Sequence, residues 1–559
     1  MVRSAIFLLP ALCAAALAAS AAAPGSALSP ANPSALDRRW VHLQCDMSKD
    51  SGFALATNRI ATAAAHGFTG VMFSLDSQLT SLYLWPEASR ERLSRAVALC
   101  DSLKLEKGVV MWGPGYPKFS FFAIDPNLSA ANPVFDTRYR VSGGRAVHLP
   151  PPSRKIVEMP QTVHAPKRDG DFSRTTVSVA PKRLCRLAMT AKAEGSGKSW
   201  PVVLAVTRRG DGGNFIEHRV FWVKTDGSEQ RFAIDFPSMD FEEVDVCCFA
   251  YNGAQDGHTT IASLELSETA PVVAVRRHGT PITVRNAKTG EAYAEGRDFA
   301  PVPKAKDVWP GDWIQPPYRF AIKPLPGGRI KEGDELSVDC YSPSPVWGKW
   351  QGACMGAIEM DEILEKSAAA VAKSVDPSVW LLGLDEVRTG GGCEDCLAIG
   401  DCAHVYAAFA KKCMAAVRRH SPRAQMYVWN DMVDPWCLSS TSRKGFYAGL
   451  YSGMKGVWDI LPCDLGIAYW RDDSRDKGMP FFSKRGRRIL VACYYDAKSL
   501  DGSVVWAKKA LETPGADGIM YCTWCDKWEL LGDWGDEMKR MAEESRRRGD
   551  VKKLDERPI

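Results

Sequence analysis

Two adjacent carboxylates, Asp385 and Glu386, follow an apolar stretch of the chain that reads VWLLGLDEV. The residues from Val379 to Leu384 are apolar, which predicts a buried strand. Two carboxylates in a partly desolvated pocket push each other's proton affinities apart, so that one can stay protonated while the other stays ionised. Acid–base cleavage of a glycosidic bond requires that division. We therefore predict that Asp385 and Glu386 are the catalytic residues of a hydrolase.

Carboxylates and aromatic rings also follow most of the other predicted strands. Aromatic rings pack on the apolar faces of pyranose sugars, and carboxylates accept hydrogen bonds from sugar hydroxyls. Single acids after strands are also common as helix N-caps and turn residues, but the whole set favours a carbohydrate site. The predicted substrate-binding residues are Asp46, Trp112, Tyr341, Arg388, Trp429, Asp431, Trp470, Tyr494, Tyr495, Trp524 and Asp526.

The elements that must position these residues alternate between strands and helices, which is typical of a parallel sheet. We predict an α/β fold with a (β/α)8 barrel of the TIM type, whose strand ends carry the chemistry. A doubly wound open sheet is the alternative, but no glycine fingerprint for a nucleotide follows any strand. Nine segments are candidate strands, so one of them must lie outside an eight-stranded ring. The candidates are 39–47, 70–76, 107–113, 334–342, 379–386, 425–431, 465–471, 488–496 and 518–524.

The strand–helix rhythm stops between residues 130 and 310. Short alternating segments separated by Pro and Gly turns predict an inserted antiparallel β-sandwich of the jelly-roll type. The GSGKS segment at 195–199 joins two such strands, so we interpret it as a hairpin and not as a phosphate loop. The sandwich resembles carbohydrate-binding modules. Its alternative role is a spacer that shapes one wall of the barrel's mouth.

The N-terminal segment has the pattern of a signal peptide. Arg3 precedes an apolar stretch from Ala5 to Ala18, and small residues surround Ser20. The stretch is short and Ala-rich for a membrane span, so we expect a secreted or periplasmic protein. The predicted ranges are a signal peptide at 1–21, a lead-in at 22–37, the first part of the barrel at 38–129, the sandwich at 130–310, the second part of the barrel at 311–540 and a charged tail at 541–559.

Composition argues against several classes of protein. The net charge of +5 is spread along a chain with 25% charged residues, so nucleic acid is not an expected partner. No other segment approaches the roughly 18 apolar residues of a membrane span. Nine His residues, without an H-x-x-x-H or H-x-H pattern, argue against a metal-dependent hydrolase. We predict a glycan or polysaccharide substrate, no cofactor and no catalytic metal.

Three cysteines follow the acid pair with a C-x2-C-x5-C spacing, namely Cys393, Cys396 and Cys402. A zinc site would need a fourth ligand, which the sequence does not identify. Export would also permit a disulfide. A zinc site, a disulfide and free thiols all remain open.

Four motifs, in order along the chain, resemble glycoside hydrolase family 20, the β-N-acetylhexosaminidases. LLGLDEV at 381–387 resembles the strand end with the catalytic pair, and YVWNDM at 427–432 resembles the next strand. ACYYD at 492–496 and MYCTWCD at 520–526 resemble the strands that carry a Tyr and a Trp of the sugar pocket. Leu382 and Leu384 stand where that family usually has His and Gly.

The resemblance implies a role for each matching residue. Glu386 would be the general acid/base, and Asp385 would orient the substrate's own 2-acetamido group as the nucleophile. Tyr494 or Tyr495 would hold the acetamido oxygen. The pocket walls would be Trp429, Trp470 and Trp524, and Asp526 would bind a hydroxyl.

The family resemblance leaves other functions open. The predicted function is an exported, exo-acting hydrolase that removes a β-linked N-acetylhexosamine or a related sugar. One alternative is an inactive glycan-binding protein on a hydrolase barrel. Another is a hydrolase in which Glu386 works with a separate carboxylate, Asp431 or Asp496, as nucleophile or base.

Overall fold

The computed structural model describes residues 35–116, 120–157, 160–210, 215–251, 254, 256–303, 320–343, 352–437, 449–494 and 496–555. The predicted signal peptide, most of the lead-in and the substrate-binding residue Tyr495 lie outside these ranges.

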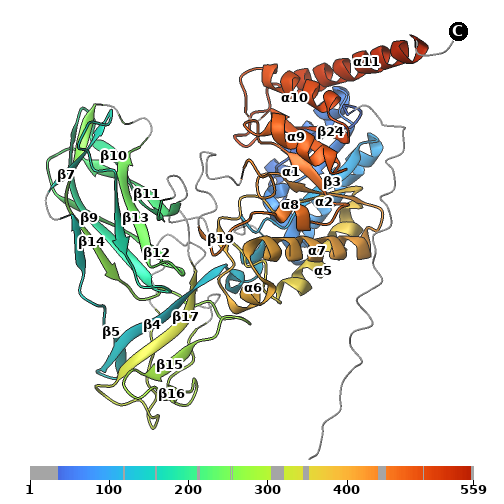
Figure 1. Cartoon of the computed structure of the whole chain (residues 1–559). Helices are drawn as coiled ribbons and strands as arrows, with labels where there is room; N and C mark the ends of the chain where they lie inside the picture. Colours follow the sequence, from blue (N-terminus) through green and yellow to red (C-terminus); the bar gives the residue numbers. More distant parts are fainter. Residues whose placement is uncertain are drawn as a thin grey trace, which may run out of the picture. The chain divides into compact units, whose positions relative to one another are not determined.

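Eight parallel strands close into a barrel (Figure 1). Closure is made between the first and last strands, where Arg39 to Val41 pair with Ile519 to Tyr521. Because all eight strands run in the same direction, their carboxyl ends meet at one rim. In barrel order they are β1 (Arg39–Leu43), β2 (Gly70–Phe73), β3 (Glu106–Met111), β18 (Val379–Leu382), β20 (Gln425–Trp429), β22 (Gly466–Tyr469), β23 (Ile489–Tyr494) and β24 (Ala516–Cys522).

Large rings fill the interior of the barrel beside glycines. A Cβ atom on Gly70 would lie 2.6 Å from the Trp40 ring, and one on Gly466 would lie 2.5 Å from the Tyr427 ring. These glycines therefore make room for Trp40 and Tyr427, each only 1% exposed. The other interior apolar residues are Met72, Val110, Val379, Leu381, Trp429, Ala468, Leu490, Ala492, Met520 and Cys522.

Helices surround the barrel and bury their apolar faces against the outer sides of the strands (Figure 1). Helix α5, for example, turns Ile363, Leu364, Ala368 and Val371 inward. Among the described residues, no helix combines the length and the apolarity needed to cross a bilayer. The helices are α1 (Asp50–Ala65), η1 (Leu75–Leu84), α2 (Glu87–Ser102), α3 (Phe121–Ile124), η3 (Pro126–Leu128), α5 (Met360–Val375), α6 (Glu394–Ile399), α7 (Cys402–His420), α8 (Val457–Ile460), α9 (Arg475–Lys484), α10 (Asp501–Glu512) and α11 (Leu531–Asp555).

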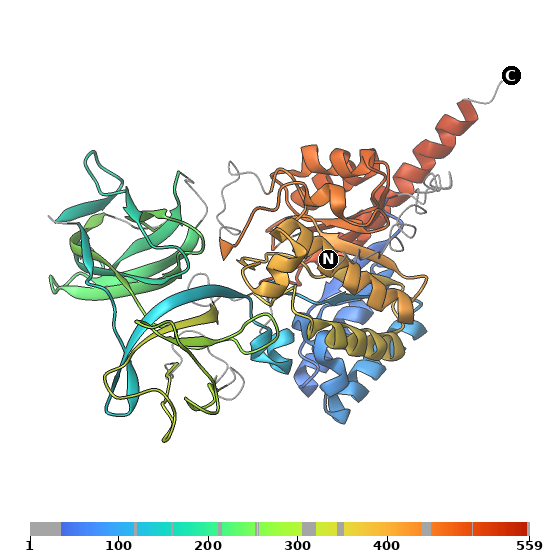
Figure 2. The ribbon, with the colours of Figure 1, turned by 60° about the horizontal axis from the view of Figure 1, so that its bottom comes forward.

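Three antiparallel sheets occupy much of the region between β3 and β18. Two of them pack face to face around their own core, which includes Leu187, Val202 and Leu264 (Figure 2). Their strands are β6 (Arg154–Val157), β7 (Gln161–Ala165), β8 (Arg174–Ser178), β9 (Leu184–Gly195), β10 (Ser199–Arg208), β11 (Phe215–Lys224), β12 (Gln230–Pro237), β13 (Glu243–Ala250) and β14 (Gly257–Glu268). The GSGKS segment joins β9 to β10, but these strands belong to different sheets and do not pair with each other, so its interpretation as a hairpin is wrong. It is a connection between the two sheets of the sandwich.

The third antiparallel sheet corrects one strand of the sequence analysis. Residues 334–342 were expected in the barrel, but β17 (Glu335–Pro343) pairs antiparallel with β4 (Ala131–Ser142) and with β15 (Thr283–Asn286). Its alternating apolar residues cover a separate core and not the barrel. The two edge strands of this sheet are β5 (Arg145–His148) and β16 (Ala292–Tyr293).

The predicted fold class, a (β/α)8 barrel with one inserted sandwich, is therefore wrong. Only 28% of the chain is helical, and three antiparallel sheets flank the closed parallel barrel. A 3-10 helix precedes α2 between β2 and β3, and the four-residue α8 is the helix described between β20 and β22. The observed architecture is a closed barrel of eight parallel strands with an extensive antiparallel part.

Candidate active site

The end of β18 places both acids at the rim of the barrel. The ladder stops at Leu382, and the N–H of Gly383 still donates to Met111 O at 2.6 Å. Glu386 then takes a positive φ of 45°, which breaks the alternation that would send neighbouring side chains to opposite faces. A non-glycine residue rarely adopts this conformation, and such positions are often found at functional sites.

The loop after β3 packs directly on the backbone of the acid pair. A Cβ atom on Gly115 would lie 2.2 Å from Asp385 O and 2.6 Å from Glu386 O. Only glycine permits this approach. It brings Tyr116, the next residue, over the side chain of Glu386.

Glu386 is held by a cation and a phenol. Arg388 Nη2 and the Tyr116 hydroxyl both donate to Glu386 Oε2. Arg388 also donates to Tyr116 Oη at 3.1 Å, and its guanidinium lies 5.0 Å from the Tyr116 ring centroid. The side chains of Arg388 and Glu386 are 4% and 15% exposed, so their ion pair is well shielded from water.

Asp385 has the opposite electrostatic environment. The residue is half-buried, and burial of its carboxyl raises its pKa well above the ordinary value. The carboxylates of Asp431 and Glu386 raise the pKa further, and Arg388 only partly opposes them. The environment of Asp385 thus favours its protonated form.

Asp431 connects the ends of three strands. Its side chain is fully buried at the end of β20, and Oδ2 accepts the backbone N–H of Glu386 at 2.9 Å. Trp470 Nε1, beyond β22, donates to Asp431 Oδ1 at 3.5 Å. The predicted residues Asp385, Glu386, Arg388, Asp431 and Trp470 are therefore brought together.

A second group of predicted residues surrounds a cavity of about 310 Å³ where β1 and β24 end. Asp46 lies there, and hydrogen bonds from Ser48 and Lys49 lower its pKa to about 2. Asp526 accepts from Arg59 Nη2 and from Trp528 Nε1, both at 2.6 Å. The lining includes Asp46, Lys49, Arg59, Thr523, Trp524, Asp526 and Trp528, and it combines charged groups with aromatic faces.

The rings of His42, Trp429 and Trp524 pack together beside this cavity, which Trp524 lines. His42 on β1 lies 5.1 Å from the Trp524 ring and 6.4 Å from the Trp429 ring, and the two Trp rings are 6.5 Å apart. Burial lowers the pKa of His42 to about 4, so its ring is neutral. Both ring nitrogens are buried without a hydrogen-bond partner in the described part of the chain.

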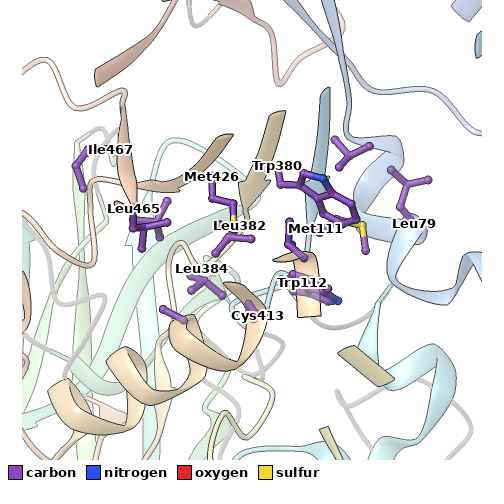
Figure 3. Close-up of a cluster of buried hydrophobic side chains, with 14 of the residues drawn as sticks. Leu79, Met111, Trp112, Trp380, Leu382, Leu384, Cys413, Met426, Leu465 and Ile467 are labelled. Carbon is purple, nitrogen blue, oxygen red and sulfur yellow. The ribbon is translucent and has the colours of Figure 1, made fainter. Parts of the chain in front are cut away.

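Three predicted substrate-binding residues lie away from these groups. Trp112 is fully buried and donates to Ser367 Oγ at 2.8 Å, and its ring stacks on Trp380 at 6.0 Å (Figure 3). Tyr341 belongs to β17, outside the barrel. Tyr494 is 6% exposed and stacks on Tyr521 at 4.3 Å. All three rings belong to the core that surrounds the barrel strands.

Asp496, an alternative nucleophile or base, holds a loop in place. Its carboxylate accepts hydrogen bonds from the Thr523 hydroxyl and from the backbone N–H groups of Trp524 and Cys525. Burial raises its pKa, but these hydrogen bonds outweigh burial and lower it. The carboxylate therefore fixes the conformation of the loop that carries Trp524.

The cysteine motif is only partly confirmed. The Cys393 and Cys396 sulfurs cluster with Cys354, which sequence reasoning missed. Cys402 lies outside that cluster and contacts Gly390 O at 3.7 Å. His42 and Arg59 were also missed, because neither lies at a strand end; only the number of polar residues near Asp46 could have pointed to them.

Comparisons with known proteins do not identify the chain. No family model matches it, so membership of glycoside hydrolase family 20 is not supported, and no curated protein matches either. Solved structures give distant similarities, mostly to carbohydrate-binding modules.

A CBM4 structure is 14% identical over 28% of this chain and 84% of its own, with a TM-score of 0.16. TmCBM61 with β-1,4-galactotriose is 12% identical over 21% and 88%, with a TM-score of 0.15. The CBM22-1–GH10 modules of Clostridium thermocellum xylanase 10B with xylohexaose are 10% identical over 72% and 93%, with a TM-score of 0.19. Similarity this low does not establish a shared fold.

Proposed function

We propose that the chain is a glycoside hydrolase that cleaves by acid–base catalysis with Asp385 and Glu386. The observation that carries this proposal is the contrast between two adjacent acids at the end of one barrel strand. Burial and neighbouring carboxylates raise the pKa of Asp385, whereas Glu386 is ion-paired with Arg388. Two nearby carboxyl groups with opposed environments are the requirement for glycosidic cleavage.

The electrostatic environments of Asp385 and Glu386 support a different role for each residue. Asp385 donates its proton to the leaving glycosidic oxygen. Glu386 supplies the negative charge, as the base for water or as the group that stabilises the developing positive charge of the sugar. Family 20 resemblance would exchange these roles, with Glu386 as the acid and Asp385 holding the acetamido group. The Arg388 contact favours the first assignment.

Three neighbours act as positioning residues. Arg388 and Tyr116 fix one oxygen of Glu386. Asp431 fixes the Glu386 backbone and raises the pKa of Asp385. The separate carboxylate that one alternative requires is therefore better explained as a support for the pair, because Asp431 is fully buried.

The proposal also names the class of sugar that the site would accept. Trp524, which is 43% exposed, offers a ring face near the rim, and Asp46, Arg59 and Asp526 offer groups that bind hydroxyls. Trp429, predicted as a second pocket wall, is 2% exposed and packs beneath Trp524. Together with the LLGLDEV motif, these groups support a β-linked N-acetylhexosamine or a related sugar, removed from a glycan.

Hydrolysis of a panel of aryl glycosides by the wild-type chain tests the function. We expect turnover of at least one β-glycoside, led by the β-N-acetylglucosaminide and the β-N-acetylgalactosaminide. Turnover only of sugars without an acetamido group would keep the hydrolase and discard the N-acetyl requirement. Absence of turnover across the panel would contradict the proposal.

Glycan binding by the sandwich is a second candidate function, favoured by one exposed face. On β11, β10 and β13 the side chains opposite the sandwich core include Trp222 and Phe249, which are 59% and 38% exposed. Tyr251, the residue directly after β13, is 45% exposed. Exposed rings on a sheet face suit stacking against sugar rings.

Removal of Trp222 tests that face. We expect Trp222→Ala to weaken retention on an insoluble polysaccharide about tenfold or more, because a large exposed aromatic anchor dominates such a contact. Leu84→Ala on η1, where Leu84 is 57% exposed, is the matched control and should retain wild-type binding. Equal retention by the wild type and Trp222→Ala would remove the face from consideration.

A further inference from the structure

Three cysteines from two distant segments of the chain lie close together. Cys354 Sγ lies 3.5 Å from both Cys393 Sγ and Cys396 Sγ, and all three sulfurs lie within 4.8 Å of one another. Each residue is no more than 2% exposed, and all three are free thiols. One sulfur is central to two others, which distinguishes the cluster from a simple cysteine pair.

The spacing of the sulfurs fits a tetrahedral thiolate site. Zinc–sulfur bonds of about 2.3 Å in a tetrahedron place neighbouring sulfurs about 3.8 Å apart. The local backbone is also adapted to the cluster, because a Cβ atom on Gly356 would lie 2.6 Å from Cys396 Sγ. A side chain at Gly356 would displace this sulfur.

A buried cation balances the charge that such a site would carry. Three thiolates around Zn²⁺ have a net charge of −1. The Arg277 side chain is 2% exposed, and its Nη1 lies 3.6 Å from Cys393 Sγ and 3.6 Å from Asp395 Oδ2. Asp395 pairs with this arginine and does not belong to the ligand group. Among the described residues, the three cysteines form the only group of His, Cys, Asp or Glu side chains whose ligand atoms all lie within 4.8 Å of one another.

We propose that Cys354, Cys393 and Cys396 bind a structural zinc ion. The ion would join the segment before α5 to the loop that follows the catalytic pair. Two hydrogen bonds extend this connection: Gly352 N–H donates to Thr389 Oγ1 at 3.0 Å, and Ala353 N–H donates to Pro114 O at 2.7 Å. Zinc would therefore brace both loops that hold Glu386, through Arg388 and Tyr116.

Metal analysis of the purified full chain tests this proposal without any activity assay. We expect about one zinc per chain by elemental mass spectrometry after dialysis. Cys354→Ser and Cys393→Ser should each lose at least tenfold of that content. Cys402→Ser is the matched control, because Cys402 is buried and close in sequence but outside the cluster, and it should keep the zinc.

A second measurement covers variants that do not fold. Wild-type chain refolded with Co²⁺ should show the intense near-ultraviolet absorption of cobalt–thiolate bonds, and added Zn²⁺ should abolish it. A wild-type chain without zinc whose intact mass reveals a disulfide within this cluster would overturn the proposal. So would three free thiols that take up neither Zn²⁺ nor Co²⁺. Either result leaves the proposed hydrolase untouched.

Discussion

Replacing Asp385 with Asn is expected to lower kcat by about 10²–10⁴-fold on a glycoside with a poor leaving group, because the variant loses its proton donor. An aryl glycoside with an acidic phenol as the leaving group needs little protonation, so the loss there should be far smaller. Steady-state rates on the two substrates measure the difference. An equal loss on both would contradict the role of Asp385 as the acid.

The pH dependence of the same variant gives an independent check. A general acid works while protonated, so wild-type activity should persist below the raised pKa of Asp385 and fall as pH rises through it. The Asn variant should lack this alkaline limb. An acid with a raised folded-state pKa also costs stability as pH rises through that value, so the variant should melt higher than the wild type near neutral pH. A lower melting temperature at neutral pH would argue against the raised pKa.

Glu386→Gln is expected to reduce kcat by about 10²–10⁴-fold on both kinds of leaving group. Gln keeps an oxygen for Arg388 and Tyr116 but removes the charge that assists cleavage. In contrast to the first variant, a better leaving group should not restore the rate. Recovery with the activated substrate would instead identify Glu386 as the acid, as the family 20 resemblance implies.

A matched control separates catalysis from folding in this variant. Asp298 is also a buried acid paired with arginine, since its Oδ2 lies 2.6 Å from Arg329, but it belongs to the antiparallel part of the chain. Asp298→Asn should lower the melting temperature and leave the kcat of the folded fraction near the wild-type value. A comparable loss of kcat in both variants would mean that Glu386 acts only through folding.

The sequence predicts the barrel strands well because their signal is local. Buried parallel strands are short apolar runs between turns, and eight of the nine candidate strands belong to the ring. The exception at 334–342 has the same local composition and differs only in its partners, β4 and β15. Pairing over such distances leaves no trace in a single sequence, and for this reason the third sheet was missed.

The candidate site, like the fold, could be predicted only in part from the sequence. Adjacency in the sequence is enough to predict a role for Asp385 and Glu386, but their different environments depend on Tyr116 and Asp431, which come from the ends of other strands. Trp112 and Tyr494 lie at strand ends like the other predicted binding residues, yet both pack into the core. Only the folded chain separates a ring that faces the rim from a ring that fills the core.

The most direct test of the central claim compares the wild type with the double variant Asp385→Asn, Glu386→Gln on every β-glycoside that the wild type hydrolyses. We predict that the wild type turns over at least one of them and that the double variant, with an unchanged circular dichroism spectrum, does not. Turnover by the double variant at the wild-type rate would show that the adjacent acids at the end of β18 do not perform the cleavage.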